Sequence, residues 1–139
     1  MCIRDSIVSE DERETSGRRH LLNYGHTIGH GIEAAAGYEA YLHGEAVAIG
    51  MTGAARLGML QGVTPEGLVE RQASLISRFG LPSSYSGIAP EAIIAAMSRD
   101  KKMAAGQVSW VLLSEAGRSS THRGVPAEQI EQVVRDLAE

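Results

Sequence analysis

The sequence predicts a mainly helical domain with one small β-hairpin. Hydrophobic residues make up 43% of the chain and aromatic residues only 4%, so alanine and leucine supply much of the core, and both favour helices. Apolar side chains recur at helical spacing in several segments, whereas β-branched and aromatic residues alternate in a strand-like way only in residues 107–113. The 139 residues correspond to about one domain, long enough to bury a core without disulfides.

The composition argues against several classes of protein. The net charge is −4 with no basic block or acidic tail, so we expect neither nucleic acid nor a membrane as a partner. The only cysteine is Cys2, which excludes an intrachain disulfide and favours a reducing compartment. There is no apolar run of transmembrane length and no signal peptide, so the expected location is cytoplasmic.

The first residues differ from the rest of the chain. Residues 1–6, MCIRDS, show no periodicity and join no clear element. We interpret them as a disordered terminus or as a non-native leader of the kind found on truncated open reading frames. If they are non-native, the protein began further upstream. We expect residues 7–139 to form the helical domain.

Two helices are predicted in the first half of this domain. Residues 21–36 carry small and apolar side chains at helical spacing, and Gly37 provides a stop. Residues 44–60 are apolar on most sides, which is typical of a helix buried on most of its surface. The glycines of this second helix lower its helix propensity and indicate close packing against another backbone. They are Gly50, Gly53 and Gly58.

The second half is predicted to contain three more helices and the hairpin. Residues 64–80 form a helix with Thr64 as its cap, and residues 90–103 form the next. Residues 107–113 form a strand, with Trp110 in the core, and residues 119–125 are a weaker partner strand. A final amphipathic helix starts at Pro126, and its apolar side is formed by Ile130, Val133, Val134 and Leu137.

Three histidines lie in one short stretch, LLNYGHTIGHGIEAAAGYEAYLHGEAVAIGM, and each is next to a glycine. His26 and His30 are four residues apart, so on a helix they share one face. His43 follows after a turn. Catalytic zinc commonly takes three protein ligands, so two or three of these imidazoles are candidates to bind one ion.

Polar and small residues around the histidines extend this hypothesis. Arg19 and Asn23 line the same face as His26 if the helix begins early, and arginine is the usual fork for a carboxylate or phosphate. Gly25 and Gly29 leave room either for a ligand to approach the backbone or for tight helix packing.

Structural roles are the alternative interpretation of each residue. A single histidine on a half-buried helix is usually a hydrogen-bonded structural residue, but three with an arginine and an asparagine nearby favour function. We interpret Glu33 as solvated or salt-bridged rather than as a ligand, and Glu45 as favouring the positive end of the next helix. The run RDKK, residues 99–102, is a solvated helix end or a phosphate site.

The residue identities in these motifs are more informative than the spacing of the histidines. DERETSGRRHLLNYGHTIGHGIEAAAGY followed by LHGEAVAIGM closely resembles the signature of 3-dehydroquinate synthase, and GLP and RDKK resemble the C-terminal region of that family. The resemblance runs from about residue 7 to the end of the chain. It implies the helical zinc- and substrate-binding C-terminal domain of the fold, without the α/β domain that binds NAD⁺ in that family.

The resemblance also implies roles for individual residues. His26 and His43 match the zinc histidines, while the third zinc ligand, a glutamate, falls outside this chain; cobalt is also accepted by such ligands. His30 would then face the substrate phosphate rather than the metal, so that two of the three histidines, not all three, would bind the ion. The remaining substrate contacts would be Arg19 to the carboxylate, Asn23 to a hydroxyl and the phosphate, and Lys101 to the phosphate.

One position departs from the family pattern. A substrate-binding lysine of the family is replaced here by Arg4, inside the suspect leader. The implied function is conversion of a sugar acid phosphate, 3-deoxy-D-arabino-heptulosonate 7-phosphate, to 3-dehydroquinate in the shikimate pathway, within a homodimer, with this chain inactive alone. The alternatives are a related sugar-phosphate cyclase, which the carboxylate-binding Arg19 disfavours, and a non-catalytic metal- or anion-binding helical module.

Overall fold

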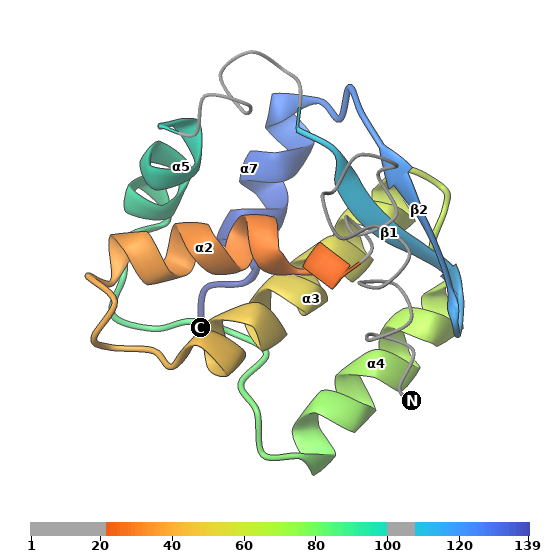
Figure 1. Ribbon diagram of the computed structural model, residues 1–139, viewed down its shortest axis with the longest axis horizontal. Helices are drawn as coiled ribbons and strands as arrows, with labels where there is room; N and C mark the ends of the chain where they lie inside the picture. Colours follow the sequence, from red (N-terminus) through yellow and green to blue (C-terminus); the bar gives the residue numbers. More distant parts are fainter. Residues whose placement is uncertain (1–21, 100–107) are drawn as a thin grey trace.

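A computed structural model of the chain describes residues 22–99 and 108–139. Its elements, shown in Figure 1, confirm the predicted fold class, because helices dominate and the strands form one small antiparallel hairpin. The helices are α2 (His26–Ala35), α3 (His43–Leu60), α4 (Glu66–Arg78), α5 (Pro90–Ser98) and α7 (Ala127–Asp136). The strands are β1 (Trp110–Glu115) and β2 (Arg118–His122).

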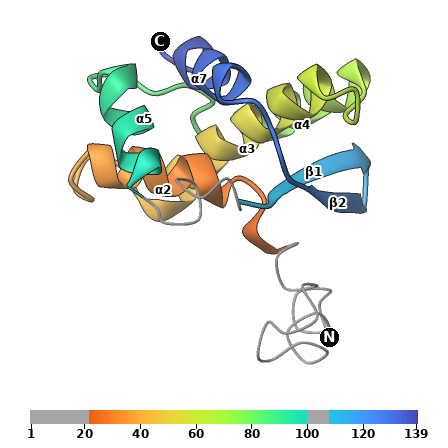
Figure 2. The ribbon, with the colours of Figure 1, turned by 90° about the horizontal axis from the view of Figure 1, so that it is seen from above.

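Helix α3 is the centre of the fold. It contacts α2, α4, α7 and β1, and Figure 2 shows it between α2 on one side and α7 on the other. Its apolar surface on most sides, which the sequence predicted, is buried against these neighbours. The main core is continuous from α2 through α3 to β1 and α7. Its most buried members include Ile28, Ile32, Ile49, Leu57, Leu112, Val133, Val134 and Leu137.

The β-hairpin presents one side to this core. Trp110 is 4% exposed and Leu112 is fully buried, which confirms the predicted core position of the tryptophan. The pairing joins Trp110 to His122 and Leu112 to Ser120, with an irregularity before Glu115. Both strands lie within three residues of their predicted bounds, because the sequence pattern marks strand existence better than strand ends.

The first helix starts later than predicted. Residue 26, not residue 21, is the first of α2, because Gly25 has a left-handed backbone with φ of 80° that a right-handed helix does not continue through. Asn23 therefore lies on the turn before α2 rather than on the helical face of His26. The early helix start, which was the condition for placing Asn23 on the same face as His26, is therefore not observed.

Thr64 is also not the cap that the sequence predicted. Pro65 is the residue that precedes α4, and the Thr64 hydroxyl instead donates a 2.6 Å hydrogen bond to the carbonyl oxygen of Leu113 in β1. Thr64 is buried, so this tertiary hydrogen bond replaces the local one. Helix α5 ends at Ser98, before the predicted end at residue 103, and residues 100–103 lie outside the described part of the chain.

No helix among the described residues is both long and apolar enough to cross a membrane.

Candidate functional site

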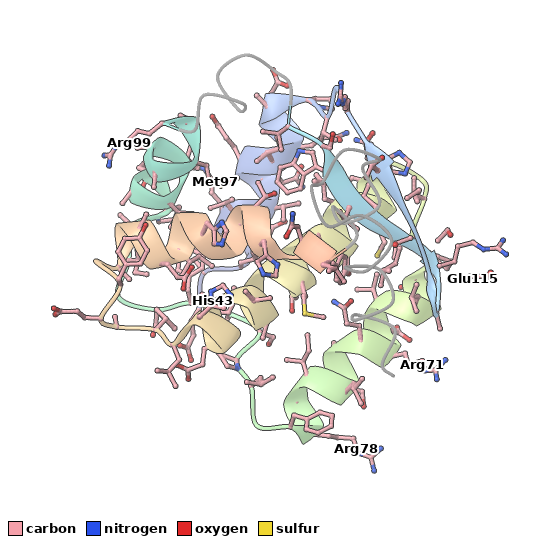
Figure 3. The ribbon with its side chains drawn as sticks, in the orientation of Figure 1. His43, Arg71, Arg78, Met97, Arg99 and Glu115 are labelled. Atoms are coloured by element: carbon pink, nitrogen blue, oxygen red, sulfur yellow. The ribbon has the colours of Figure 1, made fainter. Side chains whose placement is uncertain are left out.

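The three histidines of the motif come together in space. His26 is the first residue of α2, His30 lies one turn later, and His43 is the first residue of α3. The ring centroids are 5.5 Å apart for His26 and His30, 5.4 Å for His26 and His43, and 6.0 Å for His30 and His43. Figure 3 shows His43 at the start of α3, beside α2. The predicted grouping of these imidazoles is therefore a property of the fold.

Close contact between two helix backbones brings the histidines together. A Cβ atom added to Gly50 would overlap the carbonyl of Gly25 and lie 2.8 Å from the amide nitrogen of Gly29. A Cβ on Gly29 would in turn lie 3.2 Å from the carbonyl oxygen of Ala46. Two interpretations of Gly25 and Gly29 were room for a ligand and tight helix packing. Tight helix packing is correct, because α3 occupies the space beside both glycines.

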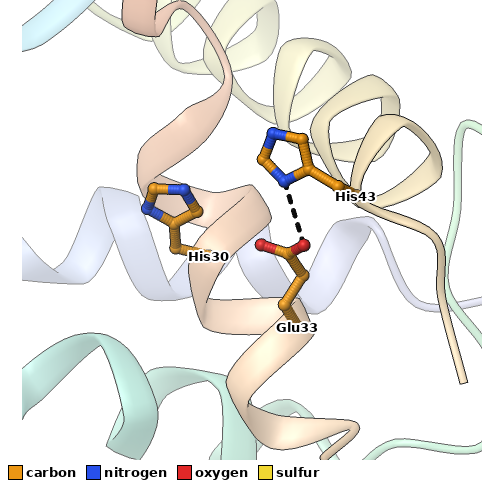
Figure 4. A group of neighbouring side chains, drawn as sticks. All are labelled: His30, Glu33 and His43. Carbon is orange, nitrogen blue, oxygen red and sulfur yellow. Dashed lines mark hydrogen bonds and ion pairs between the residues drawn. The ribbon is translucent and has the colours of Figure 1, made fainter. Parts of the chain in front are cut away.

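Two of the three imidazoles have an oxygen partner at Nδ1. The Nδ1 of His26 lies 3.3 Å from the backbone carbonyl oxygen of Tyr24. The Nδ1 of His43 lies 2.9 Å from Oε1 of Glu33, as Figure 4 shows. An oxygen atom at Nδ1 favours a proton on that nitrogen and leaves Nε2 available to bind a ligand. Among the described residues, His30 makes no comparable hydrogen bond.

The environment of His26 favours its neutral form. Partial burial lowers the pKa of His26, and the nearby His30 and His43 rings lower it further, while the backbone carbonyl of Tyr24 opposes the shift. Metal ions bind the neutral imidazole, so a lowered pKa reduces the proton competition that a metal ion meets at this nitrogen.

A second combination of ligand atoms is also possible on geometry. One nitrogen each of His30 and His43 and one oxygen of Glu33 lie within 4.8 Å of one another. This group differs from the pair expected to hold zinc, His26 and His43. The donor chemistry of either set suits zinc or cobalt, which accept imidazole and carboxylate ligands.

Glu33 is the residue whose contact with the histidine cluster was not predicted from the sequence. Of the two predicted roles, solvated or salt-bridged, the structure confirms the salt bridge, because Glu33 is 8% exposed and its partner is His43. The signal was available, because His26, His30 and Glu33 follow at spacings of four and three residues and so share one helical face.

The other predicted site residues are placed only in part. Asn23 is exposed on the turn before α2, one turn from His26 in sequence. Arg19, Lys101 and Arg4 lie outside the described residues. Glu45 lies in the first turn of α3 as predicted, where its Oε1 accepts a 2.9 Å hydrogen bond from the amide of Leu42.

Comparison with known sequences identifies similar proteins. The model of the family described as 3-dehydroquinate synthase C-terminal matches residues 1–103. The chain is 45% identical over 124 residues to a 3-dehydroquinate synthase of Rhodopirellula baltica, which covers 89% of this chain and 33% of that protein. It is 51% identical over 110 residues to one of Caldanaerobacter subterraneus subsp. tengcongensis, covering 79% of this chain and 31% of that protein. The chain thus spans about a third of the length of these curated relatives.

Solved structures share the fold. A 2-deoxy-scyllo-inosose synthase complexed with carbaglucose-6-phosphate, NAD⁺ and Co²⁺ superposes with a TM-score of 0.80 at 29% identity, covering 96% of this chain and 38% of that one. The 2-epi-5-epi-valiolone synthase of Streptomyces hygroscopicus subsp. jinggangensis, with NAD⁺ and Zn²⁺ bound, gives 0.79 at 25% identity, covering 95% and 36%.

Proposed function

The chain belongs to the 3-dehydroquinate synthase C-terminal family, and from this premise we propose that it is the metal- and substrate-binding part of a 3-dehydroquinate synthase. The reaction is the conversion of 3-deoxy-D-arabino-heptulosonate 7-phosphate to 3-dehydroquinate and phosphate, in the shikimate pathway of aromatic amino acid biosynthesis. The observation that carries the proposal is the convergence of His26, His30 and His43, with ring centroids 5.4 to 6.0 Å apart.

His26 and His43 are the metal-binding residues in this proposal. Their Nδ1 atoms face Tyr24 O and Glu33 Oε1, which supports Nε2 as the ligating atom in both. His30 lacks such a partner among the described residues, and this supports a role toward the substrate phosphate instead. The third metal ligand is a glutamate of another part of the full-length protein.

The substrate has an anionic group at each end, and the remaining residues suit those groups. Arg19 binds the carboxylate as a bidentate fork, and Lys101 neutralises the phosphate. Asn23, exposed on the turn before α2, is positioned one turn from His26 in sequence and binds a hydroxyl and the phosphate. Together these side chains account for both anionic ends of the substrate.

His26 and His43 would hold Zn²⁺ or Co²⁺, which would supply a Lewis acid when bound, and NAD⁺ would supply a hydride acceptor and donor; these side chains lack both kinds of chemistry. NAD⁺ is held mainly by a preceding α/β domain. The full-length protein is a cytoplasmic homodimer, and its partners are this domain and the small sugar acid phosphate, not nucleic acid or membrane. The 139-residue chain alone is inactive, because the NAD⁺ site and one metal ligand lie elsewhere.

A chimera tests the proposal directly. The chain is joined behind the part of the Rhodopirellula baltica relative that precedes the matched region, and phosphate release from 3-deoxy-D-arabino-heptulosonate 7-phosphate is measured with NAD⁺ and Zn²⁺. We expect turnover by the chimera, and none by the chain alone or by the chimera with His43→Ala. A folded chimera that binds NAD⁺ and Zn²⁺ but releases no phosphate would contradict the proposal.

The same chimera distinguishes the proposed synthase from the two alternative functions, a related sugar-phosphate cyclase and a non-catalytic module. A related sugar-phosphate cyclase would turn over an uncarboxylated sugar phosphate such as glucose 6-phosphate in preference. The relatives at 45% and 51% identity are named 3-dehydroquinate synthase, while the solved cyclases of other names are 25 to 30% identical, which favours the carboxylated substrate. A non-catalytic helical module would turn over neither substrate.

A further inference from the structure

We infer that Glu33 is a positioning residue that fixes the ring of His43, so that its Nδ1 carries the proton and its Nε2 is the free nitrogen of the histidine cluster. The consequence for metal binding rests on the proposed function, in which His43 is a metal ligand. The role assigned to Glu33 is distinct from direct coordination.

The contact between the two side chains is short and joins two helices. Glu33 Oε1 lies 2.9 Å from Nδ1 of His43, and Figure 4 shows the carboxylate reaching from α2 to the first residue of α3. His43 has 58% of its side chain exposed, so packing alone does not hold the ring in one orientation. The hydrogen bond therefore selects the ring orientation among those an exposed imidazole can adopt.

Burial of the carboxylate gives the contact its strength. The Glu33 side chain is only 11% exposed, and a buried carboxylate requires a hydrogen-bonding partner to offset its lost hydration. Among the described residues, His43 is the side chain that provides this partner. The carboxylate is thus held in place by its own burial, and the exposed ring takes its orientation from the carboxylate.

Direct coordination by Glu33 is the competing interpretation. Its carboxylate, His30 and His43 lie close enough to bind one ion. In that arrangement the carboxylate oxygen and Nδ1 of His43 both bind the ion and no proton lies between them. In the positioning arrangement a proton on Nδ1 joins them. His26 has the same arrangement with a backbone acceptor, Tyr24 O, which favours positioning because both rings then use the same nitrogen.

The test uses the 139-residue chain and measures the tautomer of His43 without metal. Imidazole nitrogen NMR at alkaline pH, where free imidazoles are neutral, distinguishes a proton on Nδ1 from one on Nε2. The variants are Glu33→Gln, whose amide oxygen still accepts a hydrogen bond, and Glu33→Met, which fills the same space without an acceptor. Glu39→Gln removes an exposed carboxylate from the nearby connector and serves as the matched control. Circular dichroism confirms that each variant folds.

We expect the Nδ1–H form of His43 in the parent, Glu33→Gln and Glu39→Gln, and the Nε2–H form in Glu33→Met. An Nε2–H form in the folded parent overturns the inference, and so does an unchanged tautomer in Glu33→Met. Because the parent spectrum is decisive, the inference is tested even if Glu33→Met does not fold.

A Co²⁺ titration of the same proteins separates this inference from the proposed function. Positioning predicts a loss of about 10- to 100-fold in affinity for Glu33→Met and little loss for Glu33→Gln. Equal losses in both variants, with an altered Co²⁺ absorption spectrum, overturn the inference in favour of direct ligation. If His43→Ala leaves Co²⁺ affinity unchanged while the tautomer results hold, the proposed function fails and the orienting role of Glu33 stands.

Discussion

Gly50 of α3 lies directly against the backbone of Gly25, the residue that precedes the first histidine of α2. No side chain fits between them, because a Cβ atom on Gly50 would overlap the Gly25 carbonyl and approach the Gly29 amide nitrogen to 2.8 Å. The neighbours are backbone atoms, which cannot move aside without moving a helix. The separation of α2 and α3, and with it the distance between His26 and His43, depends on this glycine.

Gly50→Ala is therefore expected to destabilise the chain by about 1–3 kcal/mol and to weaken metal binding. The methyl group forces α3 away from α2, so both the core and the histidine cluster are disturbed. Chemical denaturation gives the change in free energy of unfolding, and a Co²⁺ titration gives the change in affinity.

Gly67→Ala is the matched control for this prediction. Gly67 lies in α4, and apart from the backbone of its own helix nothing lies within 4 Å of an added Cβ, so alanine there is expected to stabilise the helix by about 0.5–1 kcal/mol. If Gly50→Ala were as stable as the parent and bound Co²⁺ as tightly, the close glycine contact would not set the site.

Tyr24 links the turn before α2 to α3 and α4, and its burial makes stability sensitive to high pH. Its hydroxyl donates a 2.6 Å hydrogen bond to Gln72 Oε1, while Gln72 Nε2 donates to the Met51 carbonyl oxygen at 2.9 Å. Burial raises the pKa of Tyr24 to about 12, although the hydrogen bond with Gln72 partly opposes the shift. The folded state thus holds the phenolic proton more tightly than the unfolded state, whose pKa is 10.0.

The contribution of the Tyr24 hydroxyl to the free energy of unfolding is fully present below pH 10 and is lost as the pH rises from about 10 to about 12. Tyr24→Phe is expected to lower stability at neutral pH by about 1 kcal/mol and to flatten the alkaline decline. Urea unfolding across this pH range measures both effects. Tyr38→Phe, which removes a phenol that is 70% exposed, should retain the decline. An identical decline in Tyr24→Phe and the parent would refute the assignment to Tyr24.

Thr64 holds the end of α3 to the hairpin. Its hydroxyl donates to the Leu113 carbonyl oxygen in β1 at 2.6 Å, and the residue is 5% exposed. Thr64→Val keeps the shape but leaves that carbonyl without its hydrogen bond, so we expect a loss of about 1–3 kcal/mol in the free energy of unfolding. Thr64→Ser keeps the hydroxyl and is expected to lose less. Thermal unfolding of both variants measures these losses, and an unchanged stability of Thr64→Val would contradict the role of the hydrogen bond.

The sequence predicted those elements whose signals are local. The apolar pattern of α3 and the Pro126 start with its amphipathic spacing in α7 were each predicted to within about two residues, because burial on one or more sides follows directly from periodicity. The grouping of His26, His30 and His43 was also predictable, since two lie one turn apart on α2 and the third opens the next helix.

Features that depend on partners distant in sequence were not predictable in this way. Thr64 has the chemistry of a helix cap, but a carbonyl of β1, 49 residues later, accepts its hydrogen bond. The late start of α2 depends on Gly25, which has a left-handed backbone and packs against α3, a partner distant in sequence. The burial of Glu33 likewise arises from the packing of α2 against neighbouring helices, which helical spacing alone does not specify.

The measurement that tests the central claim most directly is Co²⁺ affinity in three single variants of the 139-residue chain. We predict that His26→Ala and His43→Ala each lower the affinity by more than about tenfold, because each removes a ligand, and that His30→Ala changes it by less than about threefold. If His30→Ala lowers the affinity as much as His43→Ala while His26→Ala has no effect, the ion binds the group His30, Glu33 and His43 instead, and the assignment of His26 as a metal ligand is wrong.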